Sequence, residues 1–205
     1  MIKSNIKDLH LDRSKTKSAT TPASSTAQLR KDPNGINFDE DFDYRSVIGK
    51  MNFLEKSTCP DICLATHQCA QYSSDPKRIH GTAVKRIGCY LVGTADKGLI
   101  LRPMPTSSFD CWVDASFSGD WEKEIAADDA STAKSRTGYL ISYNNCPLIW
   151  TSKVQTELAL STGEAEYIAL SQSTREVIPM MSLLEEAHAI GYQEGAFIPT
   201  ILIQG

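Results

Sequence analysis

A carboxylate interrupts the apolar, strand-like segment FDCWVDASF at residues 109–117. Alternation along a strand predicts that Asp114 lies on a face of a sheet and not in a turn. An aspartate in mid-strand is disfavoured unless a cation or a hydrogen-bond donor offsets the loss of water around its charge. Asp114 is therefore a candidate cation ligand. The alternative is a hydrated carboxylate at the open end of the strand.

Two further acids, Glu164 and Glu166, open an expected helix in the run STGEAEYIAL. Acidic residues are common in a first helical turn because they interact favourably with the positive end of the helix dipole. Residues two apart on a helix point about 200° from each other, so only one of the two can face a given site.

Asp114 together with one helix-borne glutamate would make half of a two-metal site for phosphodiester hydrolysis. In such a site several carboxylates hold two divalent ions roughly 4 Å apart, one of which activates water while the other neutralises the leaving oxygen. Carboxylate oxygens favour Mg²⁺ or Mn²⁺ over zinc.

A second cluster of possible ligands, Cys59, Cys63 and His67, steps by four residues along an expected helix and so shares one face. A structural zinc site takes four ligands, usually from separated elements, and the chain contains no CxxC pair. We interpret these cysteines as part of a packing stripe and expect no metal there.

The elements that would hold these residues form two groups. In residues 44–92, three helical segments are expected, and the first has Val47, Met51 and Leu54 at helical spacing. In the last hundred residues, strand patterns at 109–117, 137–145 and 147–155 precede a helix over about residues 162–189 and a strand at 198–204. Pro179 is expected to kink or split that helix. The β-β-β-α-β order predicts an α/β fold.

Residues 1–43 are rich in Ser, Thr, Lys and Asp and are expected to form a disordered linker. The net charge of −4 is unevenly spread, with +4 in residues 50–102 and −9 in residues 103–205, so the middle segment is the part suited to face phosphate. No apolar run approaches the roughly 18–20 residues that cross a bilayer, and no secretory signal is expected. We expect an intracellular protein with reduced cysteines and no membrane partner.

The runs WVDASFSGDW and SRTGYLISYNNCPLIWTSKVQTELALSTGEAEYIALSQSTREVI resemble the ribonuclease H domain of copia-type LTR retrotransposon Pol polyproteins. Residues 44–101 are similar to the segment that joins reverse transcriptase to ribonuclease H in the same polyproteins. The resemblance implies a linker at 1–43, a helical connection segment at 44–103 and an incomplete ribonuclease H-like domain at 104–205. The β-β-β-α-β order of that domain would be truncated in its fourth strand.

This resemblance implies two-metal hydrolysis of RNA in RNA–DNA hybrids, with Mg²⁺ or Mn²⁺ as the cofactor. Asp114 falls on the family's first catalytic, metal-binding aspartate. Glu166 falls on the catalytic, metal-binding glutamate, because the run EYIA that it begins fits the family's motif, and Glu164 is the second choice. The implied partners are an RNA–DNA hybrid and the remainder of the Pol polyprotein.

Two of the family's four catalytic carboxylates have no counterpart in the 205 residues. One belongs to a D-N motif at the end of the strand after the long helix, and the other comes from a later helix. We therefore expect weak metal binding and no cleavage by the isolated chain. The alternative function is a non-catalytic module, co-opted or residual, that binds nucleic acid or protein.

Overall fold

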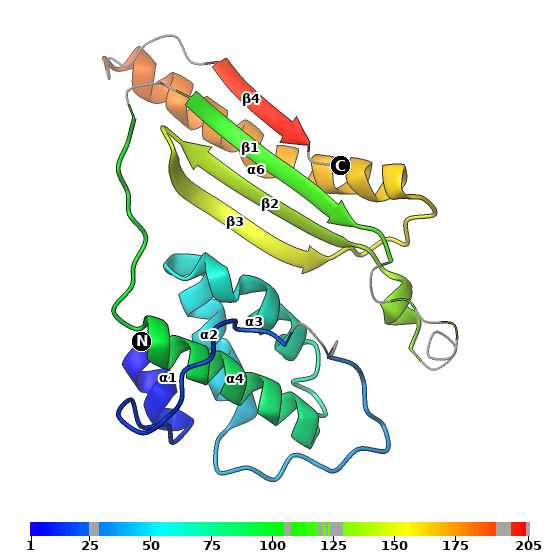
Figure 1. The fold of residues 1–205 in the computed structure, drawn as a ribbon. Helices are drawn as coiled ribbons and strands as arrows, with labels where there is room; N and C mark the ends of the chain where they lie inside the picture. Colours follow the sequence, from blue (N-terminus) through cyan, green and yellow to red (C-terminus); the bar gives the residue numbers. More distant parts are fainter. Residues whose placement is uncertain are drawn as a thin grey trace. The chain divides into compact units, whose positions relative to one another are not determined.

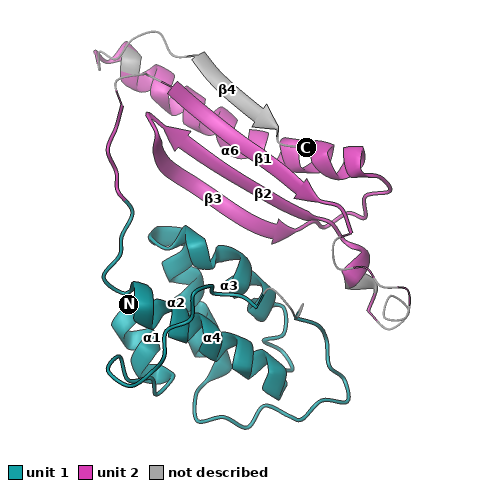
Figure 2. Cartoon of the chain, in the orientation of Figure 1, with its two compact units in different colours: residues 1–99 teal, residues 100–205 magenta. Residues whose placement is uncertain are grey.

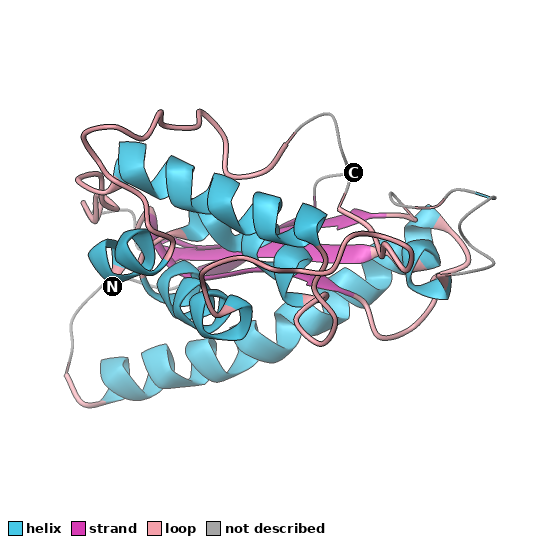
Figure 3. Ribbon diagram, turned by 90° about the horizontal axis from the view of Figure 1, so that it is seen from below, coloured by secondary structure: helices cyan, strands magenta, loops and turns pink. Residues whose placement is uncertain are grey.

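The computed structural model describes the chain except for residues 25–28, 105–107, 119–120, 122, 124–128, 192–197 and 204–205. The chain divides into two compact units, residues 1–99 and residues 100–205 (Figure 2). The first, unit 1, is built from helices, and the second, unit 2, contains a sheet and a long helix (Figure 3). The described structure is therefore mixed α/β, as the element order predicts.

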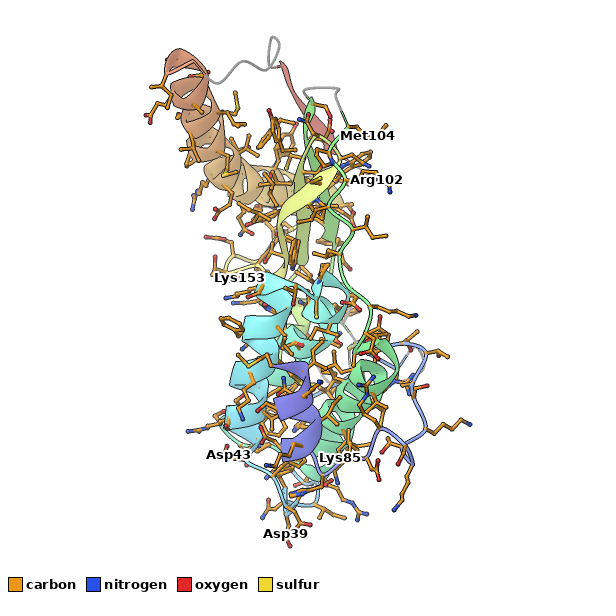
Figure 4. All side chains as sticks on the ribbon, turned by 90° about the vertical axis from the view of Figure 1, so that its left-hand side faces the viewer. Asp39, Asp43, Lys85, Arg102, Met104 and Lys153 are labelled. Carbon is orange, nitrogen blue, oxygen red and sulfur yellow. The ribbon has the colours of Figure 1, made fainter. Side chains whose placement is uncertain are left out.

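Unit 1 contains α1 (Ile2–Asp8), α2 (Tyr44–Ser57), α3 (Cys63–Ala70) and α4 (Arg78–Thr94), with a short 3₁₀ turn, η1 (Pro60–Ile62), before α3. The start of α2 is fixed by Asp43, labelled in Figure 4, whose carboxylate accepts a hydrogen bond from the Ser46 backbone N–H at 3.0 Å. Proline suits the beginning of η1 because an N–H at that position has no partner within the turn.

The core of unit 1 is built from apolar positions that repeat at helical spacing. Val47, Met51 and Leu54 of α2 are buried, which confirms the predicted stripe. The other helical segments contribute Ile62, Ala65, Cys69, Val84, Ile87 and Leu91 to the same core.

Residues 1–43 are not the unpacked linker that their polar composition predicts. They include α1, and Leu9 is 2% exposed within the core of unit 1. Gly88 of α4 makes room for this residue, because a Cβ there would lie 2.5 Å from Leu9 Cδ1. Asp8 also forms an ion pair with Lys50 of α2. The assignment of residues 44–103 and 104–205 to a connection segment and a separate domain stays a prediction.

The sheet of unit 2 has the strand order β3-β2-β1-β4. β1 (Ser108–Ser116), β2 (Arg136–Tyr143) and β3 (Cys146–Val154) form an antiparallel meander, with a 3₁₀ turn, η2 (Ala130–Ala133), before β2. α6 (Thr162–Ala189) then leads to β4 (Ile198–Ile203), which pairs in parallel with β1. Asn144 and Asn145 join β2 to β3 with positive φ angles of 49° and 65°, a conformation that asparagine adopts readily in two-residue hairpin turns.

One face of this sheet is covered by α6 (Figure 1). The helix is fully buried at positions four residues apart, which are Ala165, Ala169, Ser173 and Val177. Their small side chains allow the helix to lie close to the sheet, where Ala169 and Val177 share a core with Phe109, Cys111, Val113 and Ile141.

Pro179 does not split this helix, which is continuous over 28 residues. A proline inside a helix leaves the carbonyl four residues earlier without its N–H partner. Pro179 lies on the exposed side of α6, where water can hydrogen-bond that carbonyl. The segment between β1 and β2, residues 117–135, is described only in part and contains η2.

Candidate functional site

Asp114 lies near the end of β1, on the face of the sheet opposite the one covered by α6. Successive side chains of a strand point to opposite faces. Phe109, Cys111 and Val113 are buried in the core that includes α6, whereas Asp114 is exposed. The prediction that Asp114 lies on a sheet face is confirmed. Because water reaches the carboxylate, its charge is stable without a bound cation.

The surroundings of Asp114 on this face are open. Directly opposite on β2 is Gly138, where the nearest atoms to an added Cβ would be two backbone oxygens 3.9 Å away. The neighbouring row of the sheet, in register, consists of Trp112, Leu140 and Trp150. Asp114 therefore lies between a position without a side chain and an apolar row, accessible to an ion or a ligand.

The start of α6 assigns different roles to the two glutamates. Ser161 Oγ accepts a hydrogen bond from the Glu164 backbone N–H at 3.1 Å, and Glu164 Oε2 accepts one from the Leu160 backbone N–H at 2.7 Å. This reciprocal pair is a capping arrangement that satisfies backbone donors at the helix start. Glu166 is half-buried and makes no hydrogen bond or ion pair with any residue that the structure describes. Of the two, Glu166 has the available carboxylate.

Gln155 connects the first turn of α6 to the sheet. Its side chain is 1% exposed, and Nε2 donates hydrogen bonds to Thr137 Oγ1 at 3.1 Å and to the Ala165 carbonyl at 2.9 Å. Ala165 precedes Glu166, so this amide fixes the backbone from which Glu166 projects. The sequence gives no signal for this role, because a single glutamine after a strand does not reveal partners on two other elements.

The two predicted site residues come from neighbouring ends of packed elements. Figure 1 shows the first turns of α6 beside the end of β1. Asp114 nevertheless points away from the helix that carries Glu166. Within the described part of the chain, no hydrogen bond or ion pair joins the two carboxylates. Their role as shared metal ligands stays a prediction.

A group of metal-ligating side chains does converge in unit 1. It consists of Glu55, Cys63 and His67, whose ligand atoms all lie within 4.8 Å of one another. Two of these residues belong to the cluster singled out in the sequence, but Cys59 is replaced by a glutamate from the preceding helix.

No protein-family model matches the chain, and no solved structure matches it. No helix in the described part of the chain combines the length and the apolar character needed to cross a membrane.

Curated proteins do match. The chain is 30% identical over 170 residues to the "Retrovirus-related Pol polyprotein from transposon RE2" of Arabidopsis thaliana, covering 83% of this chain and 11% of that protein. It is 33% identical over 143 residues to the corresponding polyprotein from transposon TNT 1-94 of Nicotiana tabacum, covering 70% of this chain and 10% of that protein. The chain thus spans about a tenth of the length of these polyproteins.

A much shorter relative is the "Secreted RxLR effector protein 161" of Plasmopara viticola. It is 35% identical over 135 residues, which make up 66% of this chain and 89% of that protein.

Proposed function

Because the chain belongs to the family of copia-type retrovirus-related Pol polyproteins from transposons, we propose that residues 104–205 are the N-terminal part of a ribonuclease H domain. Its ancestral reaction is two-metal hydrolysis of the RNA strand of RNA–DNA hybrids during reverse transcription. Residues 44–103 are then the connection that follows reverse transcriptase. The observation that carries the proposal is a three-stranded meander followed by a helix that packs on β1, with Asp114 near the end of β1 and Glu166 in the second turn of the helix.

The chemistry requires acids that hold two divalent ions about 4 Å apart, and these ions supply an activated water and charge neutralisation at the leaving oxygen. The carboxylates of Asp114 and Glu166 are donors of the kind that Mg²⁺ and Mn²⁺ prefer. The 205 residues supply two of the four acids that the reaction uses in this family. We therefore expect weak binding of the ions and no turnover by the isolated chain.

Hybrid binding in this proposal depends on charge and on helix geometry. Residues 50–102 carry a net charge of +4, which suits contact with phosphates and predicts an affinity that falls steeply with salt. Recognition through the geometry of the hybrid and the 2′-hydroxyls predicts little preference for base sequence.

The test is cleavage of a labelled RNA–DNA hybrid with Mg²⁺ or Mn²⁺. The 205-residue chain is compared with the same chain extended by the polyprotein segment that follows the matched region in the RE2 relative. We expect cleavage by the extended protein only. Asp114→Asn and Glu166→Gln should abolish it, whereas Glu164→Gln should retain it because glutamine also serves in a capping arrangement.

Two results would contradict the proposal. A folded extended protein that does not cleave, or whose Asp114→Asn variant still cleaves, would overturn the ribonuclease H assignment. Cleavage by the 205-residue chain that depends on Asp114 would show instead that two carboxylates suffice, so that only the expected inactivity is wrong.

A non-catalytic interaction module is the second candidate. It is favoured by the relative that carries the name of an effector, of which the chain covers 89%. Salt-dependent hybrid binding by the 205-residue chain, without cleavage by the extended protein, is the result expected of this candidate.

A further inference from the structure

Glu55, Cys63 and His67 bring three different metal-binding groups together within unit 1. Glu55 lies in the last turn of α2, Cys63 begins α3, and His67 follows one turn later. A carboxylate oxygen, the Cys63 sulfur and a His67 ring nitrogen all lie within 4.8 Å of one another. The group thus consists of ligands from two helices joined by a short connection.

The sequence places these residues together for two reasons. Glu55 follows Val47 and Met51 at intervals of four, so it continues the buried stripe of α2. Cys63 and His67 are also four apart and so lie on one face of α3. When α3 packs against α2, Glu55 at the end of the α2 stripe therefore meets Cys63 and His67 on the facing side of α3.

The burial of this group is unusual for its chemistry. Glu55 is 1% exposed and Cys63 is 5% exposed, whereas the His67 side chain is 23% exposed. A carboxylate removed from water is unstable unless its charge is offset. His67 Nε2 lies 3.1 Å from Glu55 Oε1, and Glu55 has a further interaction within the described part of the chain. A divalent cation would bind the carboxylate, the imidazole and the sulfur together, which is what the convergence of these three donors suits.

The spacing of the three atoms suits a small tetrahedral site. Zinc binds histidine nitrogen and carboxylate oxygen at about 2.0–2.2 Å and thiolate sulfur at about 2.3 Å. In a tetrahedral arrangement such ligand atoms lie about 3.3–3.6 Å from one another. The His67–Glu55 separation of 3.1 Å is close to this range, and all three ligand atoms lie within 4.8 Å of one another, so a bound ion would draw the more distant atoms closer together.

We propose that Glu55, Cys63 and His67 form a binding site for a zinc-class divalent cation, with a fourth position for water on the side where His67 reaches solvent. Thiolate and imidazole donors select zinc or cobalt over magnesium. The site links the end of α2 to the start of α3. It does not depend on the ribonuclease H assignment, because it uses residues of unit 1 alone.

The test is a titration of the purified full chain with Co²⁺, a coloured substitute for Zn²⁺. Bound Co²⁺ should give the visible absorption of a tetrahedral ion and the near-ultraviolet charge-transfer band of a cobalt–thiolate bond, saturating at one equivalent. Zn²⁺ should abolish both signals by competition. Binding should also release a proton from the thiol and raise the thermal midpoint of the wild-type chain.

Matched variants identify the ligands. Cys63→Ser should lose the charge-transfer band, and His67→Gln should lose tetrahedral binding. Cys59→Ser should keep both signals, because the Cys59 thiol lies against Thr58 Oγ1 at 3.6 Å and is not part of the group. Circular dichroism verifies that each variant is folded.

The proposal is overturned if folded wild-type chain shows no tetrahedral Co²⁺ signal, in which case Glu55 and His67 are a buried polar pair and nothing more. It is equally overturned if Cys63→Ser keeps the charge-transfer band or if Cys59→Ser removes it. Either result would place the metal on other cysteines of the chain.

Discussion

The acidic side chains of the candidate site in unit 2 are held in different ways. Asp114 projects from a strand into water and depends on hydration for its stability. Glu166 projects from a helical turn whose backbone is tied down by the buried amide of Gln155. Glu164, two residues earlier, is engaged at the helix start. Because Asp114 is exposed and Gln155 is buried and hydrogen-bonded, substitution of Asp114 should alter function with little effect on stability. Substitution of Gln155 should mainly lower stability.

Gln155→Ala should lower the free energy of unfolding by about 2–4 kcal/mol, because two hydrogen bonds are lost and buried partners are left unsatisfied. The measurement is urea denaturation followed by tryptophan fluorescence. Lys153→Ala is the control, since Lys153 is an exposed residue two positions earlier, in β3 (labelled in Figure 4). Equal stabilities for Gln155→Ala and the wild type would refute the anchoring role.

His80 makes stability depend on pH. It is 1% exposed, its Nδ1 accepts a hydrogen bond from the Lys77 backbone N–H at 2.8 Å, and its Nε2 donates to the Arg30 carbonyl at 2.8 Å. The ring is therefore neutral, and burial lowers the pKa of His80 below its ordinary value. As pH falls below about 6.5, the unfolded chain takes up a proton at this histidine that the folded chain resists, so stability decreases.

This prediction is checked by the free energy of unfolding between pH 8 and pH 5 for the wild type and for His80→Asn. The wild type should lose stability relative to the variant as pH falls. Above the ordinary histidine pKa, the free energies of unfolding of the two proteins should change with pH in parallel. His10→Gln is the control, because His10 is exposed. If the two stability profiles stay parallel down to pH 5, His80 is not the cause of any loss of stability at low pH.

Helices and strands were predictable where their burial follows a period. Val47, Met51 and Leu54 repeat at helical spacing, and the alternation around Asp114 gives its face of the sheet, so local pattern alone was sufficient. Pro179 shows the limit of such reasoning, because whether a proline splits a helix depends on whether solvent can reach the carbonyl it leaves unpaired. Gln155 and Glu55 show the same limit, since their partners lie on other elements and only tertiary packing brings them together.

The hydrogen bond between Ser161 and Glu164 at the start of α6 should contribute to stability. Ser161→Ala removes the hydroxyl that accepts the Glu164 N–H and should lower the free energy of unfolding by about 1 kcal/mol. Ser171→Ala is the matched control, because Ser171 is an exposed serine within the same helix. The measurement is again urea denaturation, and a larger loss for Ser171→Ala than for Ser161→Ala would contradict the capping role.

At the scale of the whole molecule, the chain has two separate hydrophobic cores, one in each unit. The N-terminal segment belongs to the first of them through Leu9. Ile2, Ile6 and Leu9 do repeat at helical spacing, but this short period is masked by the polar composition of the rest of residues 1–43, so composition alone predicted a linker. The units themselves follow the change from helical to strand pattern that the sequence shows near residue 100.

Separate cores predict separate unfolding transitions. The three tryptophans, Trp112, Trp121 and Trp150, all belong to unit 2, so fluorescence reports that unit alone. Met51→Ala in unit 1 should cost about 2–5 kcal/mol, seen by circular dichroism, with the fluorescence transition unchanged. Ile141→Ala in unit 2 should shift the fluorescence transition. Equal shifts of that transition in both variants would mean that the two cores unfold as one.

Gly138, opposite Asp114, is one nucleotide change away from an acidic residue. Every glycine codon becomes an aspartate or glutamate codon by one nucleotide change, and a Cβ at this position meets only ordinary contacts. Directly opposite residues on antiparallel strands have Cβ atoms about 4.5–5.5 Å apart. A single point mutation at Gly138 would therefore place a second carboxylate beside Asp114, so that the sheet itself lies one genetic step from a new acidic pair.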